Sequence, residues 1–145
     1  MFRVTTVAAL GLFAAACTNS VDMVRDMEGA SAGTPFTKQL AVEYKKFALF
    51  ESDEMFDHPD AAYFADKALS AASGNVVEPE NLGDWGLPAG AIDEMTTARK
   101  RLVVALNASG RLKAPAQAGV AQAKFDCWVE QQEENFQVED INACK

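Results

Sequence analysis

The chain has 145 residues, of which 49% are hydrophobic, and a formal net charge of -8. This length suits a single domain of modest size with one core. The acidic balance excludes nucleic acid as a natural partner, because a negative protein repels the phosphate backbone and no basic face is broad enough to compensate.

The N-terminal residues have the layout of a bacterial lipoprotein signal. Arg3 precedes an uncharged apolar stretch over residues 4–13, and three alanines stand directly before Cys17. The stretch is too short to span a bilayer, and small residues before the cut are typical of an export signal. We therefore predict a signal peptide over residues 1–16 and several acyl chains, palmitate among them, on Cys17, because one chain alone anchors a protein only marginally. The alternative is an ordinary secretory signal with a coincidental cysteine, which Ala14 favours because lipoprotein signals more often have leucine there.

Removal of the signal peptide takes away a single charge, that of Arg3, and changes the net charge from -8 to -9. The next residues, 18–34, open with polar residues and close on glycine, alanine and serine, which bury little apolar surface. We therefore expect a lipid-anchored linker over residues 17–34, within which residues 21–27 could form a short helix. Fully extended, this linker would reach several tens of Å at about 3.3 to 3.6 Å per residue, so the domain need not touch the bilayer.

Helical spacing of apolar residues begins at Thr34. Thr34 and Pro35 supply a cap and a first-turn proline. The first helix then carries an apolar stripe of Phe36, Leu40, Tyr44, Phe47 and Phe50. Asp57 caps a second helix, which ends before Gly74.

The second half of the chain predicts a loop and three further helices. Residues 75–88 form the loop, in which Trp85 is expected to cover one end of the core. The third helix runs over residues 91–109 and stops at Gly110. Its apolar stripe contains Ile92, Met95, Leu102, Val103 and Leu106. Pro115 starts a fourth helix, which extends to about residue 135.

A short fifth helix over residues 139–145 completes the prediction. No segment shows the sustained alternation or the turn signals of a strand. The fold class is therefore all-α: a small antiparallel bundle of four main helices and a short C-terminal helix, occupying residues 35–145.

Two cysteines remain once Cys17 is assigned to lipid, and export delivers them to an oxidising compartment. We predict a disulfide between Cys127 and Cys144, because the helical pattern breaks midway between them and a chain reversal there would bring them together. The alternative is a pair of buried free thiols. A redox role is disfavoured, since no Cys-x-x-Cys pair and no adjacent base is present.

Four segments of the chain carry a resemblance: AAYFADKAL (61–69), VEPE (77–80), ARKRL (98–102) and FDCWVEQQEEN (125–135). They resemble the N-terminal region of alphaproteobacterial outer-membrane lipoproteins of the OmpA family, of the peptidoglycan-associated type. The similarity covers most of the mature chain, and its last part, with Ile141 and Cys144, is the most specific.

The resemblance implies an outer-membrane lipoprotein that faces the periplasm. Thr18 after Cys17 agrees with this sorting, because an aspartate there would favour retention in the inner membrane. In the family this region precedes an OmpA-like domain that binds peptidoglycan. This chain ends at Lys145 and no residues match the peptidoglycan-binding motif, so peptidoglycan binding is not carried over.

The sequence contains no catalytic constellation, so we predict neither an enzyme nor a metal or other cofactor. The single histidine, His58, precedes Pro59 at a helix start and is interpreted as a surface residue. No nucleophile elbow, glycine-rich phosphate loop or paired-histidine motif is present. The acidic segment over residues 53–60 lacks the spacing and the central glycine of a calcium loop, and a solvated turn explains it better.

Two charged groups are candidates for contact with a partner. Arg99, Lys100 and Arg101 form the one dense basic run, which could contact an anionic polymer or lipid headgroups. The alternative is a solvated helix face that complements the helix dipole. Near the end of the fourth helix, a strip of negative charge could contact a basic partner or be a wet turn. This strip contains Glu130, Glu133 and Glu134.

The leading hypothesis is a non-enzymatic outer-membrane lipoprotein, held through lipid on Cys17, that serves as a periplasmic scaffold or binds another envelope protein. The alternative is a small periplasmic protein that binds an apolar ligand or lipid among its helices. The residues considered for that ligand are Phe47, Phe50, Phe125 and Trp128.

Overall fold

The computed structural model describes residues 19–145, so the predicted signal peptide and Cys17 lie outside the described part. These residues are 77% helical and contain no strand, which confirms the all-α prediction. The elements in chain order are α1 (Ser20–Asp26), α2 (Pro35–Phe50), the π-helical turn η1 (Glu51–Met55), α3 (His58–Ala72), the 3-10 turn η2 (Leu82–Asp84), α4 (Ala89–Ala105), the π-helical turn η3 (Leu106–Gly110), α5 (Arg111–Lys113), α6 (Pro115–Glu134) and α7 (Val138–Cys144).

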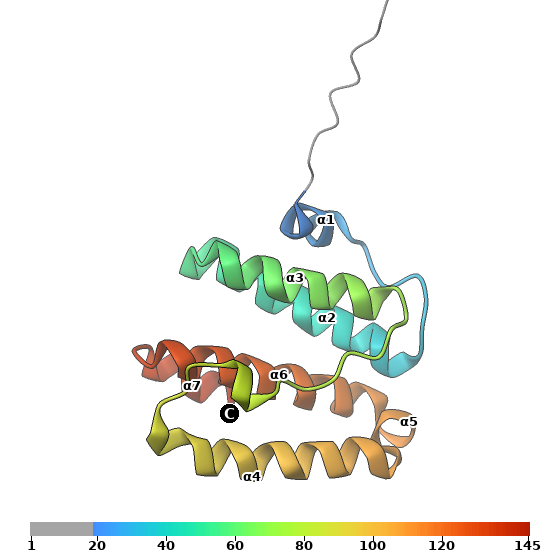
Figure 1. Ribbon diagram of the computed structural model, residues 1–145. Helices are drawn as coiled ribbons and strands as arrows, with labels where there is room; N and C mark the ends of the chain where they lie inside the picture. The colour runs from blue at the N-terminus through green and yellow to red at the C-terminus, as the bar shows by residue number, and fades with distance from the viewer. Residues whose placement is uncertain (1–18) are drawn as a thin grey trace, which may run out of the picture.

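The long helices lie alongside one another in layers. Helices α2 and α3 form one layer, α6 with the short α7 lies against α2, and α4 lines the far side of α6 (Figure 1). Contacts are densest between α2 and α3, and α4 contacts α6 much more sparsely than α2 does. The bundle is therefore built on the α2, α3 and α6 helices, with α4 as an outer element.

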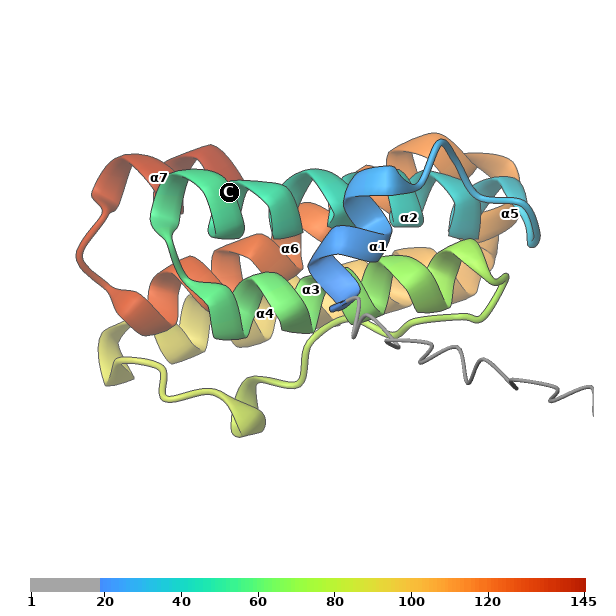
Figure 2. The ribbon, with the colours of Figure 1, turned by 90° about the horizontal axis from the view of Figure 1, so that it is seen from above.

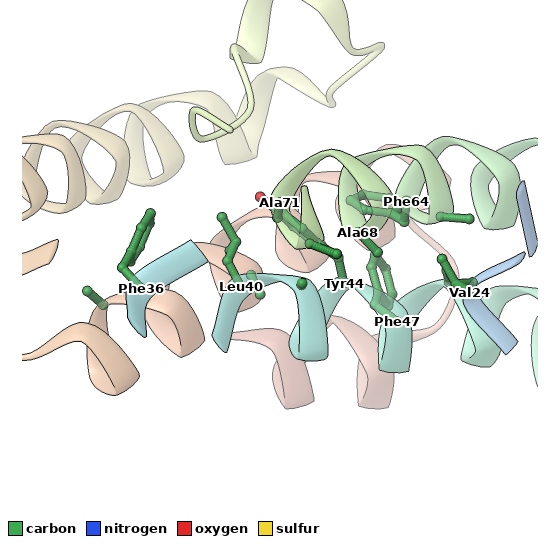
Figure 3. Close-up of a cluster of buried hydrophobic side chains, with 14 of the residues drawn as sticks. Val24, Phe36, Leu40, Tyr44, Phe47, Phe64, Ala68 and Ala71 are labelled. Atoms are coloured by element: carbon green, nitrogen blue, oxygen red, sulfur yellow. The ribbon is translucent and has the colours of Figure 1, made fainter. Parts of the chain in front are cut away.

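The main apolar core fills the space between α2 and α3 (Figure 3). The predicted stripe of α2 supplies Phe36, Leu40, Tyr44 and Phe47, all buried. Facing them, α3 presents Phe64 among small residues. These small residues, Ala61, Ala65, Ala68, Ala71 and Ala72, are buried. Because alanine side chains are short, the two helices approach closely.

The linker expected over residues 17–34 is not flexible throughout: the short helix considered for residues 21–27 is present as α1, and it is docked on the bundle. Val24 is fully buried, and Ser20 Oγ donates to the carbonyl of Ala62, 3.4 Å away. The Arg25 guanidinium makes a bidentate ion pair with Asp53, at 2.8 and 2.6 Å. Seven residues of isolated helix are unstable in water, so tertiary packing is what holds α1.

N-terminal caps mark the starts of α2 and α3, as predicted. The Thr34 hydroxyl accepts a hydrogen bond from the backbone N–H of Thr37 at 3.2 Å, and Asp57 Oδ1 accepts one from the N–H of Asp60 at 3.0 Å. Between these helices, α2 continues as η1 until Phe56, whose φ of 58° places it in the left-handed region and ends the helical run.

Helix α4 buries much less of its predicted stripe than the sequence pattern suggests. Met95 is its only fully buried residue, whereas Ile92 is 42% exposed and Leu102 and Val103 are half-buried, because α6 is the main helix that packs against α4. Gly110 does not stop the helix through a positive φ, since Ser109 takes that conformation. Gly110 is instead required by close packing: a Cβ there would lie 2.5 Å from the carbonyl oxygen of Ala105.

Helices α6 and α7 form the predicted hairpin. Asn135, with a φ of 55°, ends α6 in the left-handed conformation that asparagine tolerates. The reversal brings Cys127 and Cys144 together as a disulfide with Cα atoms 5.6 Å apart, which confirms the predicted pairing. This bond closes a second small core against α4, which contains Met95, Phe125, Trp128, Val129 and Ile141.

Candidate functional site

The face of α6 that meets α2 and α3 is polar. Gln122, Asp126 and Glu130 lie at successive i, i+4 positions, and none is more than 1% exposed. A polar face at the centre of a bundle is costly unless its groups are paired. The three residues are paired to different degrees, and they divide the interface into a buried charge network around Asp126 and a carboxyl cluster around Glu130.

In the buried charge network, every oxygen of Asp126 has a donor. Oδ2 accepts from the Tyr44 hydroxyl at 2.5 Å and from Lys67 Nζ at 2.9 Å, and Oδ1 accepts from the backbone N–H of Glu80 at 2.8 Å. Gln122 Nε2 donates to the Tyr44 hydroxyl at 3.0 Å. These bonds join α2, α3 and α6 to the loop before α4.

Glu80 is the second anion of this network, and it fixes the loop between α3 and α4. Its carboxylate makes an ion pair with Lys67, lies 2.9 and 3.0 Å from the Tyr63 hydroxyl, and accepts from Trp85 Nε1 at 3.0 Å. Its carbonyl accepts from Arg99 Nε at 2.5 Å. Trp85 therefore sits half-buried between the two apolar cores.

The network has a structural role, because its charged groups are paired or hydrogen-bonded and are largely shielded from water. Burial raises the pKa of Asp126, while Lys67, the Glu80 amide and Tyr44 oppose that shift. Burial also raises the pKa of Tyr44 well above its ordinary value. The four segments that carry the family resemblance each contribute to this network, through Tyr63 and Lys67, Glu80, Arg99 and Asp126.

The carboxyl cluster lies at the end of the bundle where η1, α3 and the end of α6 meet, and it lacks such pairing. Glu51 is fully buried and accepts one bond, from Gln131 Nε2 at 3.0 Å. Its Oε2, both carboxylate oxygens of Glu130 and Oε2 of Glu134 have no hydrogen-bond partner among the described residues.

These carboxyls hold protons more tightly than ordinary glutamates. Burial, together with the charges of Glu51, Glu134 and Asp60, raises the pKa of Glu130 to about 9. Burial and the charges of Glu134, Asp60 and Asp57 raise the pKa of Glu51 to about 8, against the hydrogen bond from Gln131. The pKa values of Glu134 and Asp60 are raised as well, first by burial and then by neighbouring carboxylates. At about pH 7, Glu51 and Glu130 therefore stay largely protonated, and no lysine or arginine among the described residues makes an ion pair with the cluster.

The three glutamates predicted as one strip for a basic partner have different environments. Glu130 is 1% exposed, so its prediction as a surface contact is wrong. Glu133 is exposed, but its Oε1 accepts from the N–H of Gly86 at 2.6 Å and so holds the loop before α4. Glu134 is half-buried at the edge of the carboxyl cluster, and its Oε2 is buried without a hydrogen-bond partner among the described residues.

The three residues of the basic run, Arg99, Lys100 and Arg101, also have different environments. Arg99 points into the bundle, where it binds the carbonyls of Glu80 and Pro79. Lys100 and Arg101 are exposed. The run is thus not one continuous basic patch, and Arg99 has a structural role that its neighbours do not share.

A groove of about 270 Å³ runs between α2 and the α6–α7 hairpin. Its lining combines apolar side chains with the disulfide: Phe47, Phe50, Ala123, Cys127, Ala143 and Cys144. Glu43, Lys46, Lys124 and Asp140 stand at its rim. Of the aromatics considered for an apolar ligand, Phe47 and Phe50 line this groove, whereas Phe125 and Trp128 belong to the small core against α4.

Other chemistry finds little support within residues 19–145. His58 is exposed at the first position of α3, as interpreted from the sequence. In that part of the chain, no group of three or more histidine, cysteine or acidic residues is arranged to hold a metal ion. None of the described helices combines the length and the hydropathy needed to cross a bilayer.

Comparisons with protein-family models, with curated proteins and with solved structures give no match to this chain.

The burial of Glu51 was not predicted from the sequence, although the periodicity of α2 indicates it. Glu51 occupies the next helical position after Tyr44 and Phe47 on the buried stripe of α2, so its burial follows from the same periodicity. The role of Phe56 was also missed, because its left-handed conformation depends on where η1 ends.

Proposed function

We propose that this chain is an outer-membrane lipoprotein, anchored through acyl chains on Cys17, whose helical domain acts in the periplasm as a non-enzymatic scaffold or partner-binding module. The observation that carries the proposal is the position of α1: the folded domain begins at Ser20, three residues after the lipidation motif. Three residues span at most about 10 Å. Lipid on Cys17 would therefore hold the bundle against the membrane surface rather than on a long tether.

Three further observations support this proposal. The disulfide between Cys127 and Cys144 suits an exported protein. The ion network of Lys67, Glu80 and Asp126 ties α3 and α6 to the loop before α4 and so fixes the shape of the domain. The exposed apolar side chains, including Phe56 and Phe136, offer contact surface to a partner.

Metabolic labelling tests the anchor. Cells that express the chain are grown with an alkyne analogue of palmitate, and the label on the protein is measured together with its distribution between membrane and soluble fractions. We expect the wild-type chain to carry label and to sediment with the outer membrane. Cys17→Ala should lose both properties, whereas Cys127→Ala should keep the label. Unlabelled wild-type protein in the soluble periplasm would reject the anchor.

A second candidate function, binding of an apolar ligand, is favoured by the groove beside Phe47 and Phe50. An aliphatic chain could lie along these rings and the disulfide, with a polar end near Lys46 or Lys124 at the rim. Native mass spectrometry of the purified, delipidated domain tests this candidate. Bound lipid that is lost in Phe50→Ser and kept in Phe56→Ser would establish it, and a ligand-free spectrum for the wild-type domain would reject it.

A further inference from the structure

Two chain reversals lie at the same end of the bundle: the junction of η1 with α3 and the junction of α6 with α7 (Figure 2). Together with the carboxyl cluster between them they form a surface that we call the acidic end. It is defined by Glu51, Phe56, Asp57, Asp60, Glu130, Glu134, Phe136 and Val138.

The acidic end exposes large apolar side chains at both reversals. Phe56 is 73%, Phe136 66% and Val138 65% exposed. Phenylalanine at a positive φ is uncommon, because its Cβ crowds the backbone, and glycine or asparagine usually fills such a position. Asn135 obeys that preference at the neighbouring reversal. Packing does not account for the ring of Phe56, since most of it is in solvent.

Several carboxyl groups of the acidic end lack hydrogen-bond donors and counterions. Glu51 and Glu130 are at least 99% buried, yet three of their four carboxylate oxygens have no hydrogen-bond donor among the described residues, and neither has Oε2 of Glu134. Within residues 19–145, no lysine or arginine makes an ion pair with any of these three side chains. A buried acceptor without a donor is unfavourable. Glu51 and Glu130 are out of reach of another molecule, but Glu134 is only half-buried and can receive a donor from a partner.

We propose that the acidic end binds a basic and partly apolar polypeptide segment of another envelope protein, whose cationic side chain reaches Glu134 while its apolar residues cover Phe56 and Phe136. Charge complementarity selects this occupant. The same negative charge repels anionic lipid surfaces and nucleic acid. A cation beside Glu134 would also favour the ionised forms of Glu51 and Glu130 behind it. This inference rests on the proposed function as a partner-binding module.

Binding of a designed peptide tests the surface directly. The mature chain is prepared with Cys17→Ser and an intact disulfide, and its affinity is measured by fluorescence anisotropy for a short labelled peptide of alternating lysine and leucine. Removing a central aromatic anchor or the paired charge of such an interface weakens binding by roughly tenfold or more. We expect that loss for Phe56→Ser and for Glu134→Gln.

Matched controls separate this site from general attraction to an acidic protein. Val104→Ser removes an equally exposed apolar side chain on α4, and Asp93→Asn removes an exposed charge on the same helix. Both should bind the peptide as the wild type does. Equal weakening by the two pairs of variants, or no binding of the peptide to the wild-type chain, overturns the proposal.

Photo-crosslinking in cells distinguishes failure of this inference from failure of the proposed function. A photoreactive amino acid is placed at position 56 or at position 104 of the anchored protein. Crosslinks to a lysine-rich or arginine-rich segment from position 56 support the acidic end. Crosslinks from position 104 alone overturn this inference and leave the partner-binding module standing. If neither position nor chemical crosslinking of the wild-type protein recovers an envelope protein, the proposed function itself fails.

Discussion

Replacement of Glu130 by glutamine should stabilise this protein, and the gain should depend on pH. The side chain is 1% exposed, neither carboxylate oxygen has a donor, and the pKa is raised from 4.5 to about 9. Below the unfolded pKa the carboxyl is protonated in both states, and its stabilising contribution is complete. As pH rises, the unfolded chain releases a proton that the folded protein retains, so stability falls until pH passes the folded pKa.

The magnitude follows from the interval between the working pH and the unfolded pKa, because each pKa unit corresponds to about 1.4 kcal/mol. At about pH 7, Glu130 lies roughly 2.5 units above its unfolded pKa of 4.5 and costs about 3 kcal/mol of unfolding free energy. At about pH 5 the same cost is below about 1 kcal/mol. Glutamine has the shape of the protonated acid and does not titrate, so Glu130→Gln should recover these amounts.

Urea unfolding followed by tryptophan fluorescence measures the effect at both pH values, since urea leaves the ionic strength unchanged. The variant should raise the midpoint strongly at about pH 7 and weakly at about pH 5, with an unchanged slope. Glu139→Gln, which removes an exposed carboxylate from the same end, is the control and should change little. An equal gain at both pH values, or wild-type stability that rises between them, would refute the reasoning.

Three further substitutions or treatments probe other parts of the structure by the same unfolding assay. Lys67→Met should destabilise the fold by roughly 3 to 5 kcal/mol, because it leaves two buried carboxylates without their shared cation. Reduction of the disulfide between Cys127 and Cys144 should lower stability by about 3 kcal/mol, the loop-closure value expected for their 17-residue separation. Gly110→Ala should cost about 1 to 3 kcal/mol, since its Cβ would meet the carbonyl oxygen of Ala105.

Each of these predictions has an internal comparison. Lys46→Met breaks an exposed ion pair with Glu43 and should cost less than about 1 kcal/mol, so a loss equal to that of Lys67→Met would contradict the role of the buried network. Gly90→Ala meets no atom within 4 Å and should stabilise α4 by up to about 1 kcal/mol. A neutral Gly110→Ala would show that the turn around Ala105 relaxes. If reduction leaves stability unchanged, α7 is held by packing alone.

The helices could be predicted from the sequence because their signals are local. The capping side chains of Thr34 and Asp57 lie three residues from the N–H groups that they accept, and both caps are where the sequence places them. The candidate contacts were predicted less well. The charge pattern predicts Arg99 and Glu130 as surface contacts, but Arg99 is half-buried against the loop before α4 and Glu130 is buried in the bundle. The lipid on Cys17 stays a prediction, because that residue lies outside the described part.

The sequence by itself determined the all-α fold class, the bounds of α2, α3 and α6, and the pairing of the two cysteines, because periodicity, caps and cysteine number are read along the chain. Only the tertiary structure decided that α1 is docked, that the inner face of α6 is polar, and that the carboxyls of Glu51 and Glu130 lack donors. The physical reason is that burial and pairing of a polar group depend on neighbours from other helices. The charge of Lys67 stabilises this fold only because α6 brings Asp126 to within 2.9 Å of its ammonium group.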